Sequence, residues 1–431
     1  MVVTATVVTT SYLRWDGRGP RAGLSRSGGY AATANREEVA RLIGALEADV
    51  RVAPTADRYT QLGQLYLERA RNEGDLRSYA SAGIAADRAL ELAPSDPDAR
   101  ILLASVRYAN HDFAGALALA ESVLAGERSN LGALATAGDA HLELGAYDEA
   151  AAAYAGLVAA RPDAPATVIR QARLAYVQGR PDDARRLAGE AEGLARATAL
   201  GGASLTVYVA YRGQVELDTG HYPDAARLFA AALEETPGSF VALAGLGRAQ
   251  AALGKRADAI RRFEQAVAVL PDPATLAALG DLYQTEGKAD RAADAYGTVE
   301  LTGTLGVLNR RAYNRVLALF YADHDTRADD ALRLSEAELQ VRKDVFGYDT
   351  YAWALFKAGR LAEARSASDD ARRANTADAR LLYHSGMIAK AQGDAVRARS
   401  ELSQALALSP EFDPLQAGRA RTALASLSAR S

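Results

Sequence analysis

The side chains best suited to chemistry in this sequence gather around a few histidines. There are five, and one of them, His324, stands between Asp323 and Asp325 in a short turn. An Asp, a His and a second Asp can supply the oxygen and nitrogen ligands of a divalent metal ion. The same residue types are also common where a helix ends in a turn, and consecutive side chains point in different directions. We therefore favour a turn without a metal, and keep metal binding by this turn or by His384 as the alternative.

The sequence lacks the motifs that carry most known enzymatic chemistry. It has no H-E-x-x-H, no glycine-rich phosphate loop and no G-x-S-x-G elbow. It also has no cysteine, which excludes disulfides, thiolate nucleophiles and cysteine-based zinc sites. We expect neither a catalytic site nor a cofactor. An enzyme on a repeat scaffold is the least favoured alternative, and it would require a dry pocket with perturbed acid and base groups.

Charge and hydropathy narrow the classes of partner. The formal net charge is −4 and the isoelectric point is near 5.9, so we expect no basic surface that would neutralise nucleic-acid phosphates. No apolar run is as long as a membrane-spanning helix requires. The expected partner is therefore a protein or peptide, with no nucleic acid and no integral membrane span. The sequence sets no oligomeric state.

The elements that must position these side chains repeat along the chain. The segment GDAHLELGAYDEAAAAYAGLVAARP, at 138–162, aligns with GQVELDTGHYPDAARLFAAALEETP at 213–237. It also aligns with GRAQAALGKRADAIRRFEQAVAVLP at 247–271 and with GDLYQTEGKADRAADAYGTVE at 280–300. The recurring positions are two glycines, an alanine and an aromatic residue. They are Gly138, Gly145, Ala150 and Tyr154; Gly213, Gly220, Ala225 and Phe229; Gly247, Gly254, Ala259 and Phe263; and Gly280, Gly287, Ala292 and Tyr296.

This spacing suits two antiparallel helices, A and B, joined by a tight turn. Gly138 lies in helix A where helix B crosses closely, and Gly145 ends helix A because a left-handed backbone costs glycine little. Ala150 starts helix B at the same crossing, and Tyr154 fills the space beside it. Pro162 stops helix B. Agreement of several positions in four segments predicts a helical hairpin.

The pattern resembles the tetratricopeptide repeat, whose period is about 34 residues. The resemblance implies an all-α fold, a right-handed α-solenoid of about ten helix–turn–helix repeats. The repeat array is expected over 55–410, with capping helices at 34–54 and 411–431 that shield its two ends.

Residues 1–33 precede the expected first capping helix. They open with the short apolar run MVVTATVV and continue into Gly-, Arg- and Ser-rich sequence. We interpret them as a flexible segment with two alternative origins: the remnant of a signal peptide or anchor without its basic leading region, or a low-complexity tail. The first alternative is slightly favoured, and it would place the protein outside the cytoplasm or tether it to a membrane.

In the family that the sequence resembles, helix A lines an inner wall where peptides bind. Transferred position by position, this wall carries an aromatic cluster with several charges in the last two repeats, which is how a binding hot spot tends to look. The residues are Asp349, Thr350, Trp353, Phe356, Lys357, Arg380, Tyr383, His384, Met387 and Lys390. The alternative is that Trp353 and Phe356 pack between adjacent A helices.

A secondary candidate surface lies in repeats four and five. Its residues are Arg170, Arg173, Tyr211, Gln214 and Asp218. Some family members grip a terminal carboxylate with Lys and Asn at fixed groove positions. In this sequence those positions hold Thr60, Gln64, Leu102, Gly132 and Thr136, which argues against such a carboxylate clamp.

These features together favour a non-catalytic scaffold that binds a protein or peptide in its groove. Two alternatives belong to other classes. One is an accessory factor that binds a small ligand or a metal for an export or uptake system. The other is the enzyme on a repeat scaffold considered above.

Overall fold

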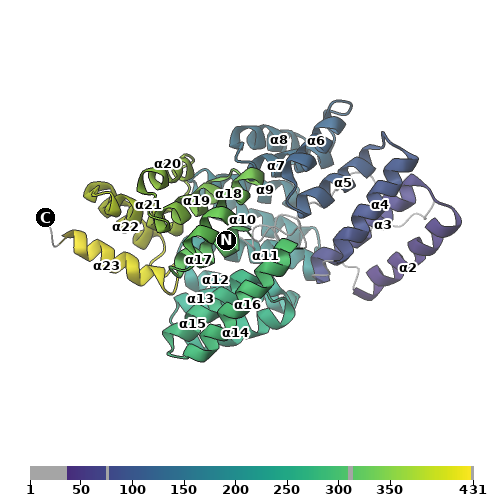
Figure 1. Cartoon of the computed structure of the whole chain (residues 1–431). Helices are drawn as coiled ribbons and strands as arrows, with labels where there is room; N and C mark the ends of the chain where they lie inside the picture. The colour runs from purple at the N-terminus through teal and green to yellow at the C-terminus, as the bar shows by residue number, and fades with distance from the viewer. Residues whose placement is uncertain (1–35, 74–76, 309–313, 429–431) are drawn as a thin grey trace. The chain divides into compact units, whose positions relative to one another are not determined.

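The computed structural model describes residues 36–73, 77–308 and 314–428. Every regular element within these ranges is an α-helix (Figure 1). In chain order the helices are α2 (Arg36–Val52), α3 (Ala56–Glu73), α4 (Arg77–Leu92), α5 (Pro97–Ala109), α6 (Phe113–Leu124), α7 (Leu131–Glu143), α8 (Tyr147–Ala160), α9 (Pro165–Val177), α10 (Pro181–Ala197), α11 (Gly202–Asp218), α12 (Tyr222–Glu235), α13 (Phe240–Ala252), α14 (Arg256–Val269), α15 (Pro273–Thr285), α16 (Ala289–Leu308), α17 (Asn314–Asp323), α18 (Ala328–Val341), α19 (Val345–Lys357), α20 (Leu361–Arg372), α21 (Ala379–Ala391), α22 (Ala395–Leu408) and α23 (Gln416–Ser428).

The helices α3 to α22 form ten consecutive hairpins, with α2 before them and α23 after them. In each hairpin the odd-numbered helix is helix A and the even-numbered helix is helix B. Neighbouring A helices also contact one another, as α17, α19 and α21 do. The predicted all-α architecture of about ten helical hairpins is confirmed. The expected segment 1–33 lies outside the described residues.

The glycines between helices A and B adopt the left-handed conformation that the spacing predicts. Gly145 has φ 76° and Gly220 has φ 80°. In the second and eighth hairpins the same place is taken by His111, with φ 63°, and Asp325, with φ 54°. Only a few residue types besides glycine tolerate this conformation, and His and Asp are among them. The turn therefore forms in both hairpins without its glycine.

Contacts between Cα atoms divide the chain into two compact units. Among the described residues, unit 1 comprises 171–192 and 206–428, and unit 2 comprises 36–170 and 193–205. The sequence pattern predicts one continuous array over 55–410 and gives no such division. The extra residues 197–203, ATALGGA, interrupt the repeat spacing close to the division.

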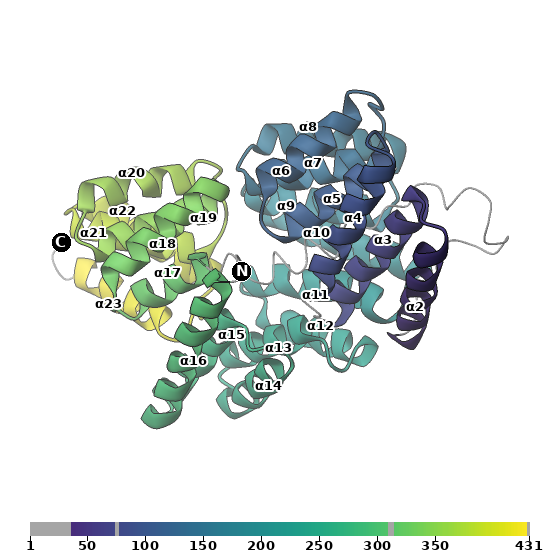
Figure 2. The ribbon, with the colours of Figure 1, turned by 45° about the vertical axis from the view of Figure 1, so that its right-hand side comes forward.

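Unit 1 is held together by contacts between segments about two hundred residues apart. The Tyr176 hydroxyl donates to Asp378 Oδ2 at 3.0 Å, and Thr376 Oγ1 donates to the Val177 carbonyl. The Tyr222 hydroxyl lies 2.9 Å from Ser409 Oγ and accepts from the Glu411 amide at 2.8 Å. The turns around α9 and α12 are thus fastened to the links that precede α21 and α23. Figure 2 shows the helices α17 to α23 of this unit side by side.

Candidate functional site

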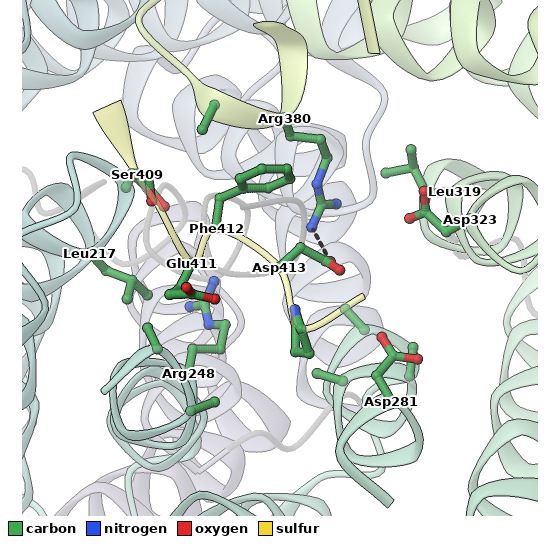
Figure 3. A pocket seen from close by; sticks show the side chains of 18 of the residues that line it. Leu217, Arg248, Asp281, Leu319, Asp323, Arg380, Ser409, Glu411, Phe412 and Asp413 are labelled. Carbon is green, nitrogen blue, oxygen red and sulfur yellow. Dashed lines mark ion pairs between the residues drawn. The ribbon is translucent and has the colours of Figure 1, made fainter. Parts of the chain in front are cut away.

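Unit 1 contains a pocket with a volume of about 260 Å³, which we call the unit 1 pocket (Figure 3). Six A helices contribute to it: α11, α13, α15, α17, α19 and α21. Tyr222 of α12 and Arg256 and Phe263 of α14 also line it. A further wall is formed by the 409–414 segment, SPEFDP, in the link between α22 and α23. The charged residues that line the unit 1 pocket are Asp218, Arg248, Arg256, Asp281, Asp323, His324, Asp349, Asp378, Arg380, Glu411 and Asp413.

Small side chains leave the room that the pocket occupies. Ala251 and Ala252 end α13, and Ala274, Ala277 and Ala278 follow one another on the first two turns of α15. Larger apolar residues close the space between the helices; they include Leu217, Phe263, Val316, Leu319, Phe320, Phe346 and Phe412. The pocket therefore combines an apolar wall with charges of both signs, which suits a ligand that is partly apolar and partly polar.

A buried chain of polar and aromatic groups lies beside the pocket. His384 Nδ1 is 2.9 Å from Asp349 Oδ2, and its ring stacks on Trp353 with centroids 4.2 Å apart. Trp353 Nε1 donates to Asp323 Oδ1 at 2.9 Å, and His384 Nε2 lies 3.9 Å from the same oxygen. His384 is thus placed between two carboxylates.

The two carboxylates govern the protonation of this imidazole. Burial disfavours the charged ring, but the charge and hydrogen bond of Asp349 and the nearby charge of Asp323 outweigh it and raise the pKa of His384. Burial also opposes ionisation of Asp323, yet His384 and the charge of Arg380 lower its pKa. The arrangement favours the charged form of the His384 imidazole.

A second histidine is held in a similar way at the wall of the pocket. His324 Nε2 lies 2.8 Å from Asp281 Oδ1, which also accepts from the Tyr296 hydroxyl at 2.8 Å. His324 Nδ1 is 2.7 Å from the Phe320 carbonyl. Burial opposes the charge on this ring, but the hydrogen bond and charge of Asp281 raise the pKa of His324. Asp281 Oδ1 is therefore already hydrogen-bonded to two side chains of unit 1, those of His324 and Tyr296.

The arginines of the pocket meet different partners. Arg248 donates to Gln214 Oε1 at 2.6 Å, and Gln214 donates to Asp218 Oδ1 at 2.6 Å. Burial raises the pKa of Asp218 to about 6. Arg380 instead forms an ion pair with Asp413 of the 409–414 segment at 3.6 Å, drawn in Figure 3. Burial raises the pKa of Asp413, and the nearby charges of Asp281 and Asp323 add to this rise against the opposing charge of Arg380.

Three family models match parts of the sequence. One describes the anaphase-promoting complex, cyclosome, subunit 3, and covers residues 75–157; two describe the tetratricopeptide repeat and cover 135–198 and 216–282. The matched segments carry the glycine spacing and the hairpins described above. The chain is a tetratricopeptide repeat protein.

Solved structures with the same kind of fold resemble it at low identity. The hetero-tetramer Cut9–Hcn1 of the APC/C is 13% identical over 91% of this chain and 88% of that chain, with a TM-score of 0.45. A human IFIT1 dimer with m7Gppp-AAAA is 15% identical over 87% of this chain and 96% of that chain, with a TM-score of 0.48. A thermophilic tetratricopeptide repeat protein from Thermus thermophilus is 18% identical over 45% of this chain and 98% of that chain, with a TM-score of 0.40. No curated protein matches significantly.

Several of the groove residues expected in the last two tetratricopeptide repeats are buried. Trp353 is 0% exposed, and Tyr383 and His384 are each 1% exposed. They are covered from the side expected to be open: the Tyr383 hydroxyl donates to Gln416 of α23 at 2.7 Å, and its ring is 5.5 Å from that of Phe412. The expected open aromatic patch is therefore absent here, and Trp353 packs as in the alternative interpretation.

The other expected groove residues divide into two sets. Asp349, Thr350 and Arg380 line the unit 1 pocket, although the first two are themselves buried. Lys357 and Met387 are half-buried and do not line it. The Lys357 ammonium pairs with Asp325 and lies 4.5 Å from the centroid of the Trp353 ring.

Four of the five residues of the secondary surface are buried, so they do not form an open surface. Arg170 belongs to unit 2, where it is 2% exposed and forms a bidentate pair with Asp139 at 2.9 and 3.0 Å. Arg173, Tyr211 and Gln214 belong to unit 1 and are buried. Gln214 reaches the unit 1 pocket only through its bonds to Arg248 and Asp218.

The side chains of the Asp323–His324–Asp325 turn diverge. Asp323 accepts from Trp353, His324 meets Asp281, and Asp325 pairs with Lys357 and, at 3.3 Å, with Arg419. Among the residues that the structure describes, no three carboxylates or imidazoles are grouped so that they could hold a metal ion.

The 409–414 segment is the part of the site that the sequence pattern misses. The expected capping helix was to begin at residue 411, but α23 begins at Gln416. Pro410 and Pro414 bracket the acidic and aromatic residues Glu411, Phe412 and Asp413. Two prolines four residues apart disfavour continuous helix and are the signal that could have indicated an irregular segment.

Proposed function

We propose that this protein is a non-catalytic scaffold whose unit 1 pocket binds a segment of a partner protein. The observation that supports this proposal is the convergence of six successive A helices on one pocket with apolar walls and charges of both signs. Such a lining can bury one or two side chains and orient polar groups beside them. The buried imidazole–carboxylate groups stabilise the wall that presents these charges.

A small molecule and a nucleic acid are the two other classes of ligand. A pocket of about 260 Å³ could also hold a small molecule, as the accessory-factor hypothesis requires. The human IFIT1 structures contain PPP-AAAA or m7Gppp-AAAA, so tetratricopeptide folds include proteins with such ligands. In this chain the net charge of −4 favours a protein segment over a nucleic acid. No helix in the described part of the chain is long and apolar enough to cross a membrane.

A larger side chain at Ala274 is expected to fill part of the pocket. Ala274 lines it near the start of α15 and is half-buried, whereas Ala268 on α14 is exposed and lies outside it. We expect Ala274→Tyr to reduce partner capture from the native host at least about tenfold, because the new ring occupies the space of the partner's side chain. Capture by crosslinking and mass spectrometry, with thermal melts to check folding, measures this.

The matched variant Ala268→Tyr should retain the partner. Equal capture by Ala274→Tyr and wild type would show that the partner binds elsewhere. A nucleic acid or a small molecule recovered by wild type and lost from Ala274→Tyr, with no protein lost, would place the site correctly and refute the proposed ligand class.

A further inference from the structure

The 409–414 segment is irregular backbone placed inside an otherwise helical unit. Seven residues separate α22 from α23, against six between α20 and α21, four between α12 and α13 and three between α14 and α15. The longer link carries Phe412 and Asp413 into the unit 1 pocket, as Figure 3 shows. The link is only one residue longer than the link between α20 and α21, so the feature to explain is the position of Phe412 and Asp413 in the pocket.

The segment is held by the kinds of contact that a bound peptide makes. Its backbone is fixed by the Glu411 amide, which donates to the Tyr222 hydroxyl. Its aromatic ring, Phe412, packs against the buried cluster that contains Tyr383. Its carboxylate, Asp413, pairs with Arg380. Main-chain hydrogen bonding, an aromatic anchor and a charge pair together form a small recognition site.

Arg380 pairs with the carboxylate of Asp413, although the pocket also contains carboxylates from the helices. Asp281 is engaged by His324 and Tyr296, and Asp349 is engaged by His384. The ion pair of Arg380, by contrast, is made with the segment itself. Removal of the segment would therefore leave this arginine facing the pocket without that carboxylate.

The segment is also held at an electrostatic cost. Asp413 is buried near the like charges of Asp281 and Asp323, and burial and these charges raise its pKa. A partner can displace a contact that carries this cost. The 409–414 segment is covalently attached, however, which gives it a high effective concentration at the pocket. An external peptide must therefore compete with it.

We propose that the 409–414 segment is an intramolecular ligand of the unit 1 pocket, and that the partner carries the same chemistry, an aromatic residue followed by a carboxylate. This inference rests on the proposed function and specifies its ligand. The partner displaces Phe412 and Asp413 and takes their places against Tyr383 and Arg380.

The test uses the full chain and a fluorescein-labelled peptide of residues 408–416, LSPEFDPLQ. The double variant Phe412→Ala/Asp413→Ser removes the ring and the charge, while serine keeps a cap for α23 in place of Asp413, which accepts from the Leu415 and Gln416 amides. We expect the peptide to bind this variant at least about tenfold more tightly than wild type, because the competing segment has lost its anchors. Fluorescence anisotropy measures both affinities.

Peptide variants test the chemistry. LSPEASPLQ should bind at least about tenfold more weakly than the parent peptide, and adding Arg380→Ala to the double variant should weaken the parent peptide similarly. Equal affinity of the parent peptide for wild type and the double variant would overturn the proposal. So would tighter binding of LSPEFKPLQ, since the pocket would then select a cation.

A measurement on wild type alone keeps the proposal testable should the double variant unfold. Saturating LSPEFDPLQ should accelerate hydrogen exchange of the Glu411 amide, because displacement of the segment breaks its bond to Tyr222, and LSPEASPLQ should not. Unchanged exchange would overturn the proposal. If Ala274→Tyr abolishes partner capture while the labelled peptide binds no form of the chain, the proposed function holds and only this inference fails.

Discussion

The imidazole of His384 does not line the unit 1 pocket but contacts a residue that does. Its Nδ1 atom lies 2.9 Å from Asp349, which lines the pocket. Its ring stacks on Trp353, whose Nε1 donates a hydrogen bond to Asp323. Its 1% exposure excludes direct contact with a ligand in this structure. A buried charge that is paired and hydrogen-bonded fixes the positions of its partners, so His384 orients carboxylates that the pocket presents.

The raised pKa of His384 predicts how stability depends on pH. The folded pKa lies above the unfolded value of about 6.5, so this stabilisation is fully present below pH 6.5 or so and is lost as pH rises through the folded pKa. The unfolding free energy of wild type should therefore fall above this pH. His384→Gln should flatten the fall, with a residual slope from His324, whose pKa is also raised.

Urea unfolding between about pH 6.5 and pH 8.5 measures this slope. An equal or steeper slope in His384→Gln would contradict the prediction. So would an NMR titration that places the His384 pKa below its ordinary value.

At the scale of elements, the helical hairpin follows from glycines of two kinds. Gly145 and Gly220 turn the chain with positive φ, whereas Gly138 lies within α7 where α8 crosses it. A Cβ atom at Gly138 would lie 2.6 Å from Cδ1 of Tyr154. Tyr154 also donates to the buried Asp139, so the close crossing is linked to the Asp139–Arg170 pair.

Two glycine substitutions in helices of unit 2 should therefore have opposite effects. Gly138→Ala should destabilise the unit by about 1–3 kcal/mol, because the methyl group displaces the Tyr154 ring. Gly193→Ala should stabilise it by about 0.5–1 kcal/mol, because this glycine is exposed in α10 and no neighbouring atom lies within 4 Å of its added Cβ. Denaturant unfolding of both variants checks the signs, and a stabilising Gly138→Ala would refute the packing explanation.

The sequence predicts these elements well because their determinants are local. Glycine spacing, small residues at the crossing and prolines after helix B reflect steric limits within one hairpin, and even His111 and Asp325 take the expected turn. The inward positions Asp349, Thr350 and Arg380 also follow from that register. The burial of Trp353 and His384 does not, because α23 and the 409–414 segment are placed by contacts such as Tyr222 with Ser409, far apart in the chain.

At the scale of the molecule, unit 1 differs from an open array of repeats because its first turns are bonded to its last links. Tyr176 and Tyr222 fasten the links before α21 and α23, and these links bring Asp378 and the 409–414 segment to the pocket. The pocket is thus assembled by residues from both ends of the unit. The pocket therefore depends on contacts between distant repeats as well as on the fold of each repeat.

Entry of a partner into the unit 1 pocket is tested most directly by photo-crosslinking from two positions on one helix. Arg256 is exposed at the rim of the pocket, and Arg261, also exposed on α14, lies outside it. A photoreactive amino acid at each position in turn is illuminated in the native host. Crosslinking to one protein segment from position 256 and none from 261 is the predicted result. Equal crosslinking from both positions, or from 261 alone, would contradict binding in the pocket.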